Sequence, residues 1–103
     1  MAAYIISKEA LEDINNIWLH TLESRSLEQA DRYYNLILNE IEYISDNFEV
    51  GQDIGYIRMG YRYSKIKSHL IFYKKSKSET IEIVRVLHEK MNIASRLNDT
   101  VSN

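Results

Sequence analysis

The stretch YRYSKIKSHLIFYKKSKSETIEIVRVLH, residues 61–88, decides the fold because strand-forming segments in it alternate with short polar breaks. The segments 61–67, 69–75 and 80–88 are rich in Tyr, Ile, Val, Phe and Leu, which favour β-strands. Ser68 and the run 76–79 separate them, and both breaks are short enough for hairpin turns. The stretch therefore predicts three consecutive antiparallel strands.

The second and third of these strands carry apolar residues of both parities. Residues 70–73 are all apolar or aromatic, which predicts that the middle strand is covered on both faces. In the third strand, Ile81 and Ile83 share one parity, whereas Val84 and Val86 share the other. That strand is therefore either buried on both faces or interrupted by a bulge that shifts its phase.

A strand and a helix are expected before this stretch, at the start of the sequence. Residues 4–6 (Tyr-Ile-Ile) favour a short strand, and Ser7 follows them as a helix N-cap. Good helix formers continue from residue 8 to about residue 23. Their apolar stripe consists of Leu11, Ile14, Ile17 and Trp18.

The next segment carries the clearest helical period in the chain. Ser26 and Gln29 form a capping box, so a second helix is expected to begin there. Apolar residues then recur at spacings of three and four, on one helical face about six turns long. They are Leu27, Ala30, Tyr34, Ile37, Ile41, Ile44 and Phe48. The predicted core comprises Leu11, Ile14, Trp18, Tyr34, Ile37, Ile41 and Ile44.

The order of elements predicts an α+β fold. Its expected parts are an N-terminal strand, a helical hairpin packed on one face of an antiparallel sheet, and a short C-terminal helix at 89–97. Gly51 and Gly55 mark a loop between the hairpin and the strands. The 103 residues are expected to form one domain, residues 1–103, with a core at about 3–97 and a frayed tail at 98–103. Because two helices cover only one face, the other face is expected to be partly open.

Composition excludes several kinds of function. The chain has no Cys, which excludes disulfides, thiolate metal sites and cysteine nucleophiles. No apolar run reaches the length of a membrane span and no signal-peptide pattern is present, so a cytoplasmic protein without membrane contact is expected. The glycines form no phosphate-binding loop, and no nucleophile elbow occurs. His20, His69 and His88 lack metal-ligand spacing, so neither a metal nor a cofactor is expected.

Charge is distributed unevenly along the chain. Residues 1–50 contain three basic and ten acidic side chains, whereas residues 51–103 contain ten basic and five acidic ones. The segment 58–77 holds seven Lys or Arg and no acid. Such a segregation indicates a surface that meets an anionic partner, with a solvated face as the alternative.

The basic and aromatic residues of the predicted strands are the candidate binding site. Cations attract phosphate or carboxylate groups, and tyrosine rings stack on bases or seat a peptide. A metal-free ribonuclease uses such groups, with a general base at the 2′-hydroxyl and cations that stabilise the phosphorane. An acidic partner segment fits the same cluster, and the residues alone leave both alternatives open. The predicted site comprises Arg58, Tyr61, Arg62, Tyr63, Lys65, Lys67, His69, Arg85 and His88 on the expected open face.

Five segments together resemble a known family. They are Ala10-Leu11-Glu12-Asp13-Ile14 with Ile17-Trp18, Gln29-Ala30 with Tyr33, Gly60-Tyr61-Arg62, the run 69–73 and the run 81–88. Their joint order and spacing resemble the ParE branch of the RelE/ParE toxin superfamily, over residues 3–97. The resemblance implies the toxin of a plasmid- or chromosome-borne type II toxin–antitoxin pair. Such a toxin binds and inhibits DNA gyrase, which blocks replication, and a ParD-like antitoxin neutralises it within a hetero-oligomer.

The RelE branch of the same superfamily supplies the alternative. Those toxins cleave messenger RNA on the ribosome with basic residues and often with a C-terminal tyrosine. Here no tyrosine follows Tyr73, and the last predicted strand is followed by Glu89-Lys90-Met91-Asn92. Arg62 and Arg85 correspond to basic positions of those nucleases, and His88 offers an acid or base. The resemblance therefore favours a non-enzymatic gyrase inhibitor over the ribonuclease, and an inactive binding module is the third alternative.

Overall fold

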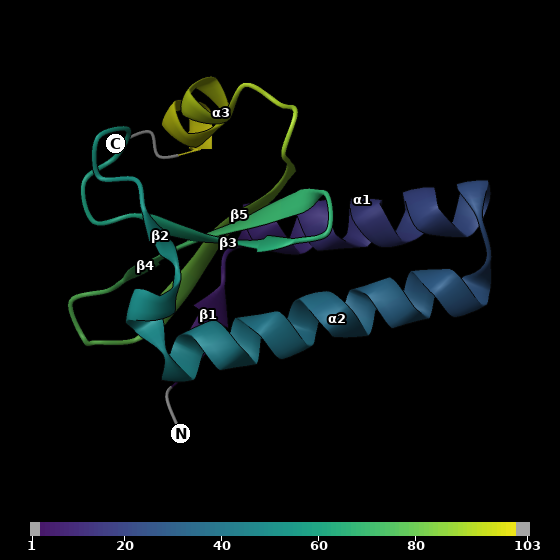
Figure 1. The fold of residues 1–103 in the computed structure, drawn as a ribbon, viewed down its shortest axis with the longest axis horizontal. Helices are drawn as coiled ribbons and strands as arrows, with labels where there is room; N and C mark the ends of the chain where they lie inside the picture. Colours follow the sequence, from purple (N-terminus) through teal and green to yellow (C-terminus); the bar gives the residue numbers. More distant parts are fainter. Residues whose placement is uncertain (1–2, 101–103) are drawn as a thin grey trace.

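The computed structural model describes residues 3–100, which form a sheet with helices packed on it (Figure 1). In chain order the elements are β1 (Tyr4–Ile6), α1 (Lys8–Ser24), α2 (Leu27–Asp46), the 3₁₀ turn η1 (Phe48–Val50), β2 (Gln52–Asp53), β3 (Arg62–Ile66), β4 (His69–Lys75), β5 (Ile81–His88) and α3 (Ile93–Thr100). The predicted α+β fold is confirmed, including the N-terminal strand, the helical hairpin and the short C-terminal helix.

The sheet has five strands in the order β1-β5-β4-β3-β2. The strands β2 to β5 pair antiparallel, as consecutive strands joined by short turns do. The first strand, β1, is parallel to β5 and pairs with Ile81–Ile83. The two-residue strand β2 lies where the sequence predicted only a loop, and its pairing with Arg62 and Tyr63 closes the other edge.

Both helices begin at the caps that the sequence predicted. The Ser7 hydroxyl accepts a hydrogen bond from the Ala10 N–H at 3.0 Å, and the Ser26 hydroxyl accepts one from the Gln29 N–H at 3.1 Å. The two helices run side by side along one face of the sheet, and their joined ends project past the strands (Figure 1). This overhang of the hairpin positions the candidate site described below.

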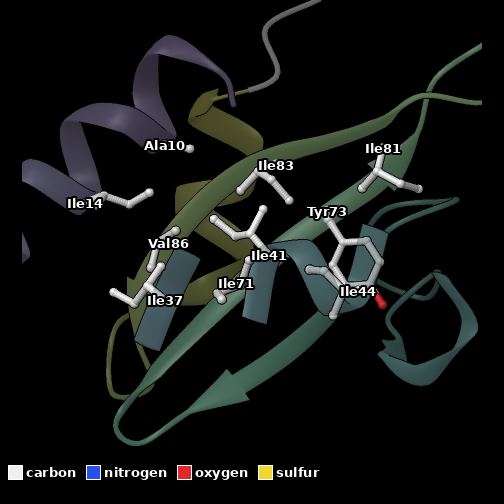
Figure 2. Packing of buried hydrophobic residues seen from close by; sticks show 10 residues of the cluster. All are labelled: Ala10, Ile14, Ile37, Ile41, Ile44, Ile71, Tyr73, Ile81, Ile83 and Val86. Carbon is white, nitrogen blue, oxygen red and sulfur yellow. The ribbon is translucent and has the colours of Figure 1, made fainter. Parts of the chain in front are cut away.

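The main core lies between the hairpin and the sheet (Figure 2). Four members of the predicted stripes, Ile14, Ile37, Ile41 and Ile44, are fully buried there against strand residues. The strand side of this core is made by Ile71, Tyr73, Ile81, Ile83 and Val86. Removal of one such isoleucine side chain costs about 2–5 kcal/mol, so this layer provides much of the stability of a small fold.

Two of the predicted core residues lie elsewhere. Leu11 is 47% exposed, because α1 turns Ala10 and Ile14 toward the sheet and Leu11 lies about 100° further round the helix. Trp18 is only partly buried, since its indole N–H donates to the Asp31 carboxylate of α2 at 2.9 Å. Tyr34 is also partly buried and packs against the core from α2. The prediction of a core position was wrong for Leu11, and Trp18 joins the two helices instead.

A second apolar cluster covers the opposite face of the sheet, so the expectation of a partly open face was wrong. It consists of Ile54, Tyr61, Phe72, Val84, Leu87 and Leu97, with Ile57, Tyr63, Leu70 and Ile93 packed against it. These residues come from β3, β4, β5, the loop 54–61 and α3. The middle strand is therefore buried on both faces, as its sequence predicted. The loop 54–61 has no regular apolar spacing, and α3 is a short helix whose large apolar residues are only Ile93 and Leu97, so the sequence did not predict their covering role.

Strand β5 shows both of the features that its sequence left as alternatives. It is buried on both faces, and its register against β4 shifts between Phe72 and Tyr73. The extra residue in β5 reverses the alternation, so that Ile83 and Val86 both belong to the main core. The neighbouring Val84 and Leu87 belong to the second cluster.

The C-terminal helix begins later than expected. Residues 89–92 form a turn in which the Lys90 N–H donates to His88 Nδ1 at 3.1 Å, and α3 begins at Ile93. The Asn92 side chain accepts from the Ser95 N–H and so caps this helix. The helix α3 extends to Thr100, residues 101–103 lie outside the described residues, and the frayed tail at 98–103 stays a prediction. Within the described chain, no helix is long and apolar enough to cross a membrane.

Candidate functional site

Three of the predicted site residues are built into the fold. The Arg62 guanidinium lies over the Phe48 ring and donates to the Gly51 carbonyl oxygen at 2.7 Å, on the hairpin side of the sheet. Tyr61 and Tyr63 lie on the opposite side, where Tyr61 is buried and Tyr63 packs against Phe72. All three side chains are therefore engaged in packing.

Two more predicted residues lie on the face opposite the hairpin. The Lys65 ammonium group contacts the Glu89 carboxylate at 2.8 Å, and both side chains are partly exposed. This hydrogen bond raises the pKa of Lys65 and lowers the pKa of Glu89. Arg58 lies in the loop 54–61, where its backbone N–H donates to the Ile54 carbonyl oxygen at 3.0 Å.

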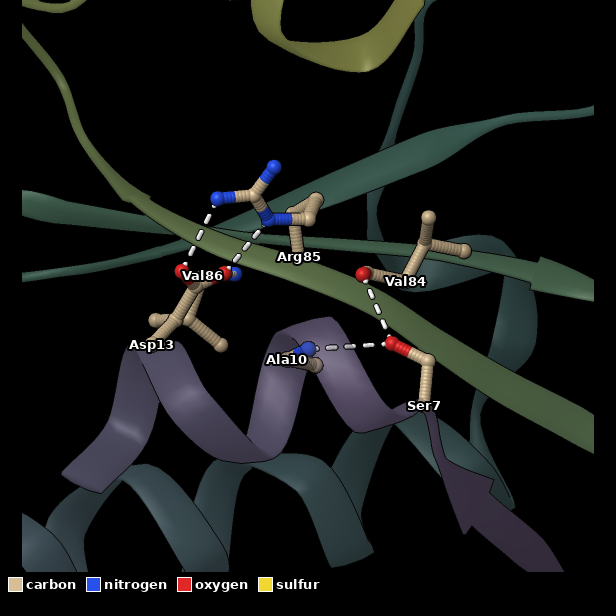
Figure 3. Close-up of polar contacts among 6 residues, drawn as sticks. All are labelled: Ser7, Ala10, Asp13, Val84, Arg85 and Val86. Carbon is tan, nitrogen blue, oxygen red and sulfur yellow. Dashed lines mark hydrogen bonds and ion pairs between the residues drawn. The ribbon is translucent and has the colours of Figure 1, made fainter. Parts of the chain in front are cut away.

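Arg85 lies at the edge of β5 in a network with the first helix (Figure 3). Its guanidinium donates to both carboxylate oxygens of Asp13, at 2.7 and 2.9 Å, and the two side chains are only 15% and 13% exposed. The Val86 N–H donates to Asp13 at 3.0 Å, and the Ser7 hydroxyl donates to the Val84 carbonyl oxygen at 2.9 Å. Because β1 ends at Ile6, these two side chains take over the edge pairing of β5. The bidentate hydrogen bond to Asp13 raises the pKa of Arg85.

The expectation of one shared basic face was therefore wrong. Arg62 and Lys65 are of opposite parity in β3 and point to opposite sides of the sheet. Lys67 lies in the turn between β3 and β4, and the irregular register of β5 brings Arg85 to the sheet edge. Successive side chains of a strand point to opposite faces of the sheet. The number of charged residues in a segment therefore does not show which face each of them occupies.

The remaining predicted residues, Lys67, His69 and His88, meet in a cleft of about 890 Å³. We call it the hairpin cleft because it lies at the projecting end of the helical hairpin, against the β3–β4 turn and the end of β5. It is lined by His20, Thr21, Ser24, Arg25, Gln29, Arg32, Tyr33, Leu36, Lys67, Ser68, His69 and His88. Hence residues far apart in the sequence come together at one place.

A hydrogen-bonded group of rings lies in the hairpin cleft. The Tyr33 hydroxyl is 2.7 Å from His69 Nδ1 and donates to the Ile66 carbonyl oxygen at 3.1 Å. A hydroxyl has one hydrogen to donate, so donation to Ile66 makes the His69 Nδ1–H the donor to Tyr33. The His69 and His88 rings meet edge to face, with their centroids 5.3 Å apart. Burial, followed by the nearby charges of His88 and His20, lowers the pKa of His69, and burial raises the pKa of Tyr33.

The charged side chains that line the hairpin cleft are all cationic. Arg25, Arg32 and Lys67 come from the inter-helix turn, α2 and the β3–β4 turn, and none of the described residues that line the cleft is Asp or Glu. Arg32 also lies 3.7 Å from Glu28 one turn earlier in α2, with both side chains well exposed. The arrangement suits an anionic ligand. It does not suit a metal ion, and no group of metal-ligating side chains occurs among the described residues.

Sequence reasoning missed the helical half of the cleft. His20 lacks metal-ligand spacing in the sequence, and Arg25, Arg32 and Tyr33 are absent from the predicted site because they lie in the acidic half of the chain. Their charges give no linear signal, since a cleft whose described lining holds no carboxylate arises only when the hairpin tip folds beside the β3–β4 turn. The spacing of Arg25, Gln29, Arg32 and Leu36 along α2 and its preceding turn is the one pattern that puts them on one side.

Comparison with known proteins shows a shared fold and identifies the family. A chain in the chromosomal ParDE TA system from P. aeruginosa has the same fold, with a TM-score of 0.73 over 85% of this chain and 96% of that one, at 17% identity. Residues 4–93 match the sequence model of the ParE toxin of type II toxin-antitoxin system, parDE. The chain therefore belongs to the ParE toxin family, and it is a ParE-type toxin of a type II toxin–antitoxin system.

Named relatives of similar length agree with this assignment. The chain is 34% identical to Toxin ParE1 of Caulobacter vibrioides over 97 residues, which cover 94% of this chain and 99% of that protein. It is 32% identical to Toxin ParE1 of Mycobacterium tuberculosis (strain ATCC 25618 / H37Rv) over 94 residues, covering 91% and 96%. It is 26% identical to Toxin ParE of Escherichia coli over 99 residues, covering 96% of each chain.

Proposed function

We propose that this toxin acts by binding DNA gyrase and inhibiting it, which blocks replication, and that it does so without catalysis of its own. The observation that carries the proposal is the match to the ParE toxin family over residues 4–93. The near full-length similarity to two ParE1 toxins supports it, because the whole fold is shared rather than one motif. A gyrase inhibitor needs a recognition surface and no chemical step.

The direct test measures gyrase activity with purified toxin. We expect loss of supercoiling or accumulation of cleaved DNA, together with intact messenger RNA on translating ribosomes. A toxin that leaves gyrase active would contradict the proposal. Growth arrest on induced expression, measured in parallel, separates an active toxin from an inactive binding module.

A second candidate function is ribosome-dependent cleavage of messenger RNA, and the His69–His88 pair is the observation that favours it. One imidazole removes the proton of a 2′-hydroxyl and the other protonates the leaving 5′-oxygen in such a reaction. The rings are adjacent, and burial lowers the pKa of His69, which favours the neutral ring that can accept a proton. Ribosome-bound message cut by the wild type but not by a His88→Ala variant, with gyrase unaffected, would establish this alternative.

We further propose that a ParD-like antitoxin neutralises the toxin in a hetero-oligomer, by laying an amphipathic segment over it. Exposed apolar side chains on the hairpin, Leu11 and Leu19 of α1 and Leu27 of α2, are candidate anchors for such a segment. Lys65 and Lys67 are candidate partners for its acidic residues, each exposed pair contributing about 0–1 kcal/mol. Arg58, Tyr63 and His69 remain proposed contacts of lesser exposure, whereas Arg62 and Arg85 are occupied within the fold.

Coexpression with the neighbouring upstream gene tests the antitoxin proposal. We expect that gene to encode a small acidic protein that copurifies with the toxin and restores growth. A toxin that purifies alone and still arrests growth in the presence of that protein would contradict the pairing.

A further inference from the structure

We propose that the hairpin cleft binds the phosphate group of a nucleotide or of a nucleic acid. This site is an addition to gyrase recognition and does not depend on it. The geometry that carries the proposal is the convergence of Arg25, Arg32 and Lys67 with His20, His69 and His88 around one hollow that no carboxylate of the described residues lines.

The cationic lining is unusual for this chain, whose formal net charge is −2 and whose residues 1–50 contain ten acids and three bases. Two of those three bases, Arg25 and Arg32, line the cleft. Gathering like charges is unfavourable unless a counter-charge is bound among them. The contact of Arg32 with Glu28 is solvent-exposed and therefore holds the guanidinium only weakly.

The backbone of Lys67 is an independent observation. Its φ of 52° lies in the left-handed region, which favours Gly or Asn and costs free energy for a lysine. The β3–β4 turn is two residues long, so glycine would suit this position better. The side chain at this strained position lines the cleft, so a cation stands at the hollow where glycine would place none.

The histidines add a hydrogen-bond donor. His88 Nδ1 accepts a hydrogen bond from the Lys90 N–H, so the neutral ring carries its hydrogen on Nε2 and donates from there. Arginine guanidinium groups supply paired donors that match phosphate oxygens. Because the cations come from different elements, they suit the tetrahedral oxygens of a phosphate group better than a planar carboxylate.

The size of the cleft indicates more than a bare phosphate. A volume of about 890 Å³ is within the usual range of small-molecule sites. Tyr33 and Leu36 contribute a ring and an apolar side chain to the same lining, where a base or a sugar can pack. A smaller hollow of about 340 Å³ shares His20, His69 and His88 with it and extends toward Arg85. The cleft therefore fits a phosphate that carries a nucleoside.

Binding by the purified toxin tests the proposal without gyrase. The probes are deoxyadenosine 5′-monophosphate, deoxyadenosine, acetate, inorganic phosphate and a single-stranded dodecamer of DNA. We expect calorimetric binding of the monophosphate or of the dodecamer, with displacement of the His88 imidazole resonances, and no binding of deoxyadenosine. Tighter binding of the monophosphate identifies a nucleotide site, and tighter binding of the dodecamer identifies a nucleic-acid site.

Lys67→Gly is the most informative variant because its effects on folding and on binding differ in sign. Glycine relieves the left-handed backbone, so the melting temperature is expected to stay the same or rise, while phosphate affinity falls about tenfold. Glu79→Gly is the matched control, since Glu79 has φ 67° in the β4–β5 turn, outside the cleft lining. Lys77→Gln controls for net charge and is expected to leave binding unchanged.

Arg25→Gln removes a cation on the helical side of the cleft and is also expected to weaken binding of the phosphorylated probes. The proposal is overturned if neither the monophosphate nor the dodecamer binds. It is equally overturned if both cleft variants bind like wild type, if deoxyadenosine or acetate binds as tightly as the phosphorylated probes, or if only inorganic phosphate at high concentration binds. A failure of gyrase inhibition would leave these measurements unaffected, so the two proposals fail separately.

Discussion

The first half of α1 and its far end use charge in opposite ways. Near the start of the helix, Asp13 meets Arg85 and the Val86 N–H, so each charge has its partner within the fold. At the other end, His20 and Arg25 join further cations in a cleft without a carboxylate among its described lining residues. The difference shows which charges hold the structure together and which remain available to a ligand.

The largest expected effect is at the paired end. Asp13→Ala removes both acceptors of the nearly buried Arg85 and leaves the Val86 N–H without its partner. We expect a loss of about 3 kcal/mol in the free energy of unfolding, measured by urea denaturation. Arg85→Ala and the double variant complete a mutant cycle, and additive effects in that cycle would mean that the pair is not coupled.

The second prediction concerns the hairpin cleft, where His69 should make the free energy of unfolding depend on pH. The pKa of His69 is lowered from the model-compound value of 6.5, so below that pH the unfolded chain binds more protons than the folded one. The contribution of His69 to the free energy of unfolding is therefore complete above about pH 6.5. It is lost as the pH falls toward the pKa of His69 in the folded state. Urea denaturation between pH 7.5 and 5.5 should show this loss, and His69→Gln should reduce it. An unchanged profile in the variant would assign the titration to other groups.

A smaller effect is expected on association with the antitoxin. Lys65 is already paired with Glu89, whereas Lys67 lines the cleft with other cations. Lys67→Glu should therefore slow association several-fold and weaken its dependence on salt, and Lys65→Glu should do so less. Stopped-flow association at two ionic strengths measures both. Equal effects of the two variants would show that the pairing with Glu89 does not persist in solution.

The smallest expected effect compares the two ends directly. Arg25→Gln removes one of several like charges, so the free energy of unfolding should stay unchanged or rise by about 0.5 kcal/mol or less in low salt. The same measurement on Arg85→Gln should show a clear decrease. A decrease for Arg25→Gln as large as that for Arg85→Gln would remove the distinction between the two ends.

Local signals in the sequence predicted the elements well. Ser7 and Ser26 marked the helix starts because a cap is a contact within a few residues. The strands were evident for a similar reason, since Leu70 to Tyr73 form an apolar run bounded by turns. Caps and apolar runs depend on residues that are close together in the sequence, so they can be recognised without the structure.

The site was less predictable because it depends on register and on distant pairs. An irregularity between Phe72 and Tyr73 of β4 changes the side toward which Arg85 points, and no charge pattern encodes it. Arg25 and Lys67 are 42 positions apart and meet only through the overhang of the hairpin. The second face of the sheet is likewise covered partly by Ile54 of an irregular loop and by Leu97 of a short helix, and neither segment indicates in the sequence which face it covers.

The parallel pairing of β1 with β5 has a consequence for synthesis of the chain. Tyr4 pairs with Ile81, so the first strand has no place in the sheet until residues 81–83 have been translated. The contacts between the two helices of the hairpin are local in sequence, so the hairpin forms early, because short loops close quickly. Its apolar faces then await the strands, and nascent chains of this toxin should be protease-sensitive until β5 emerges from the exit tunnel.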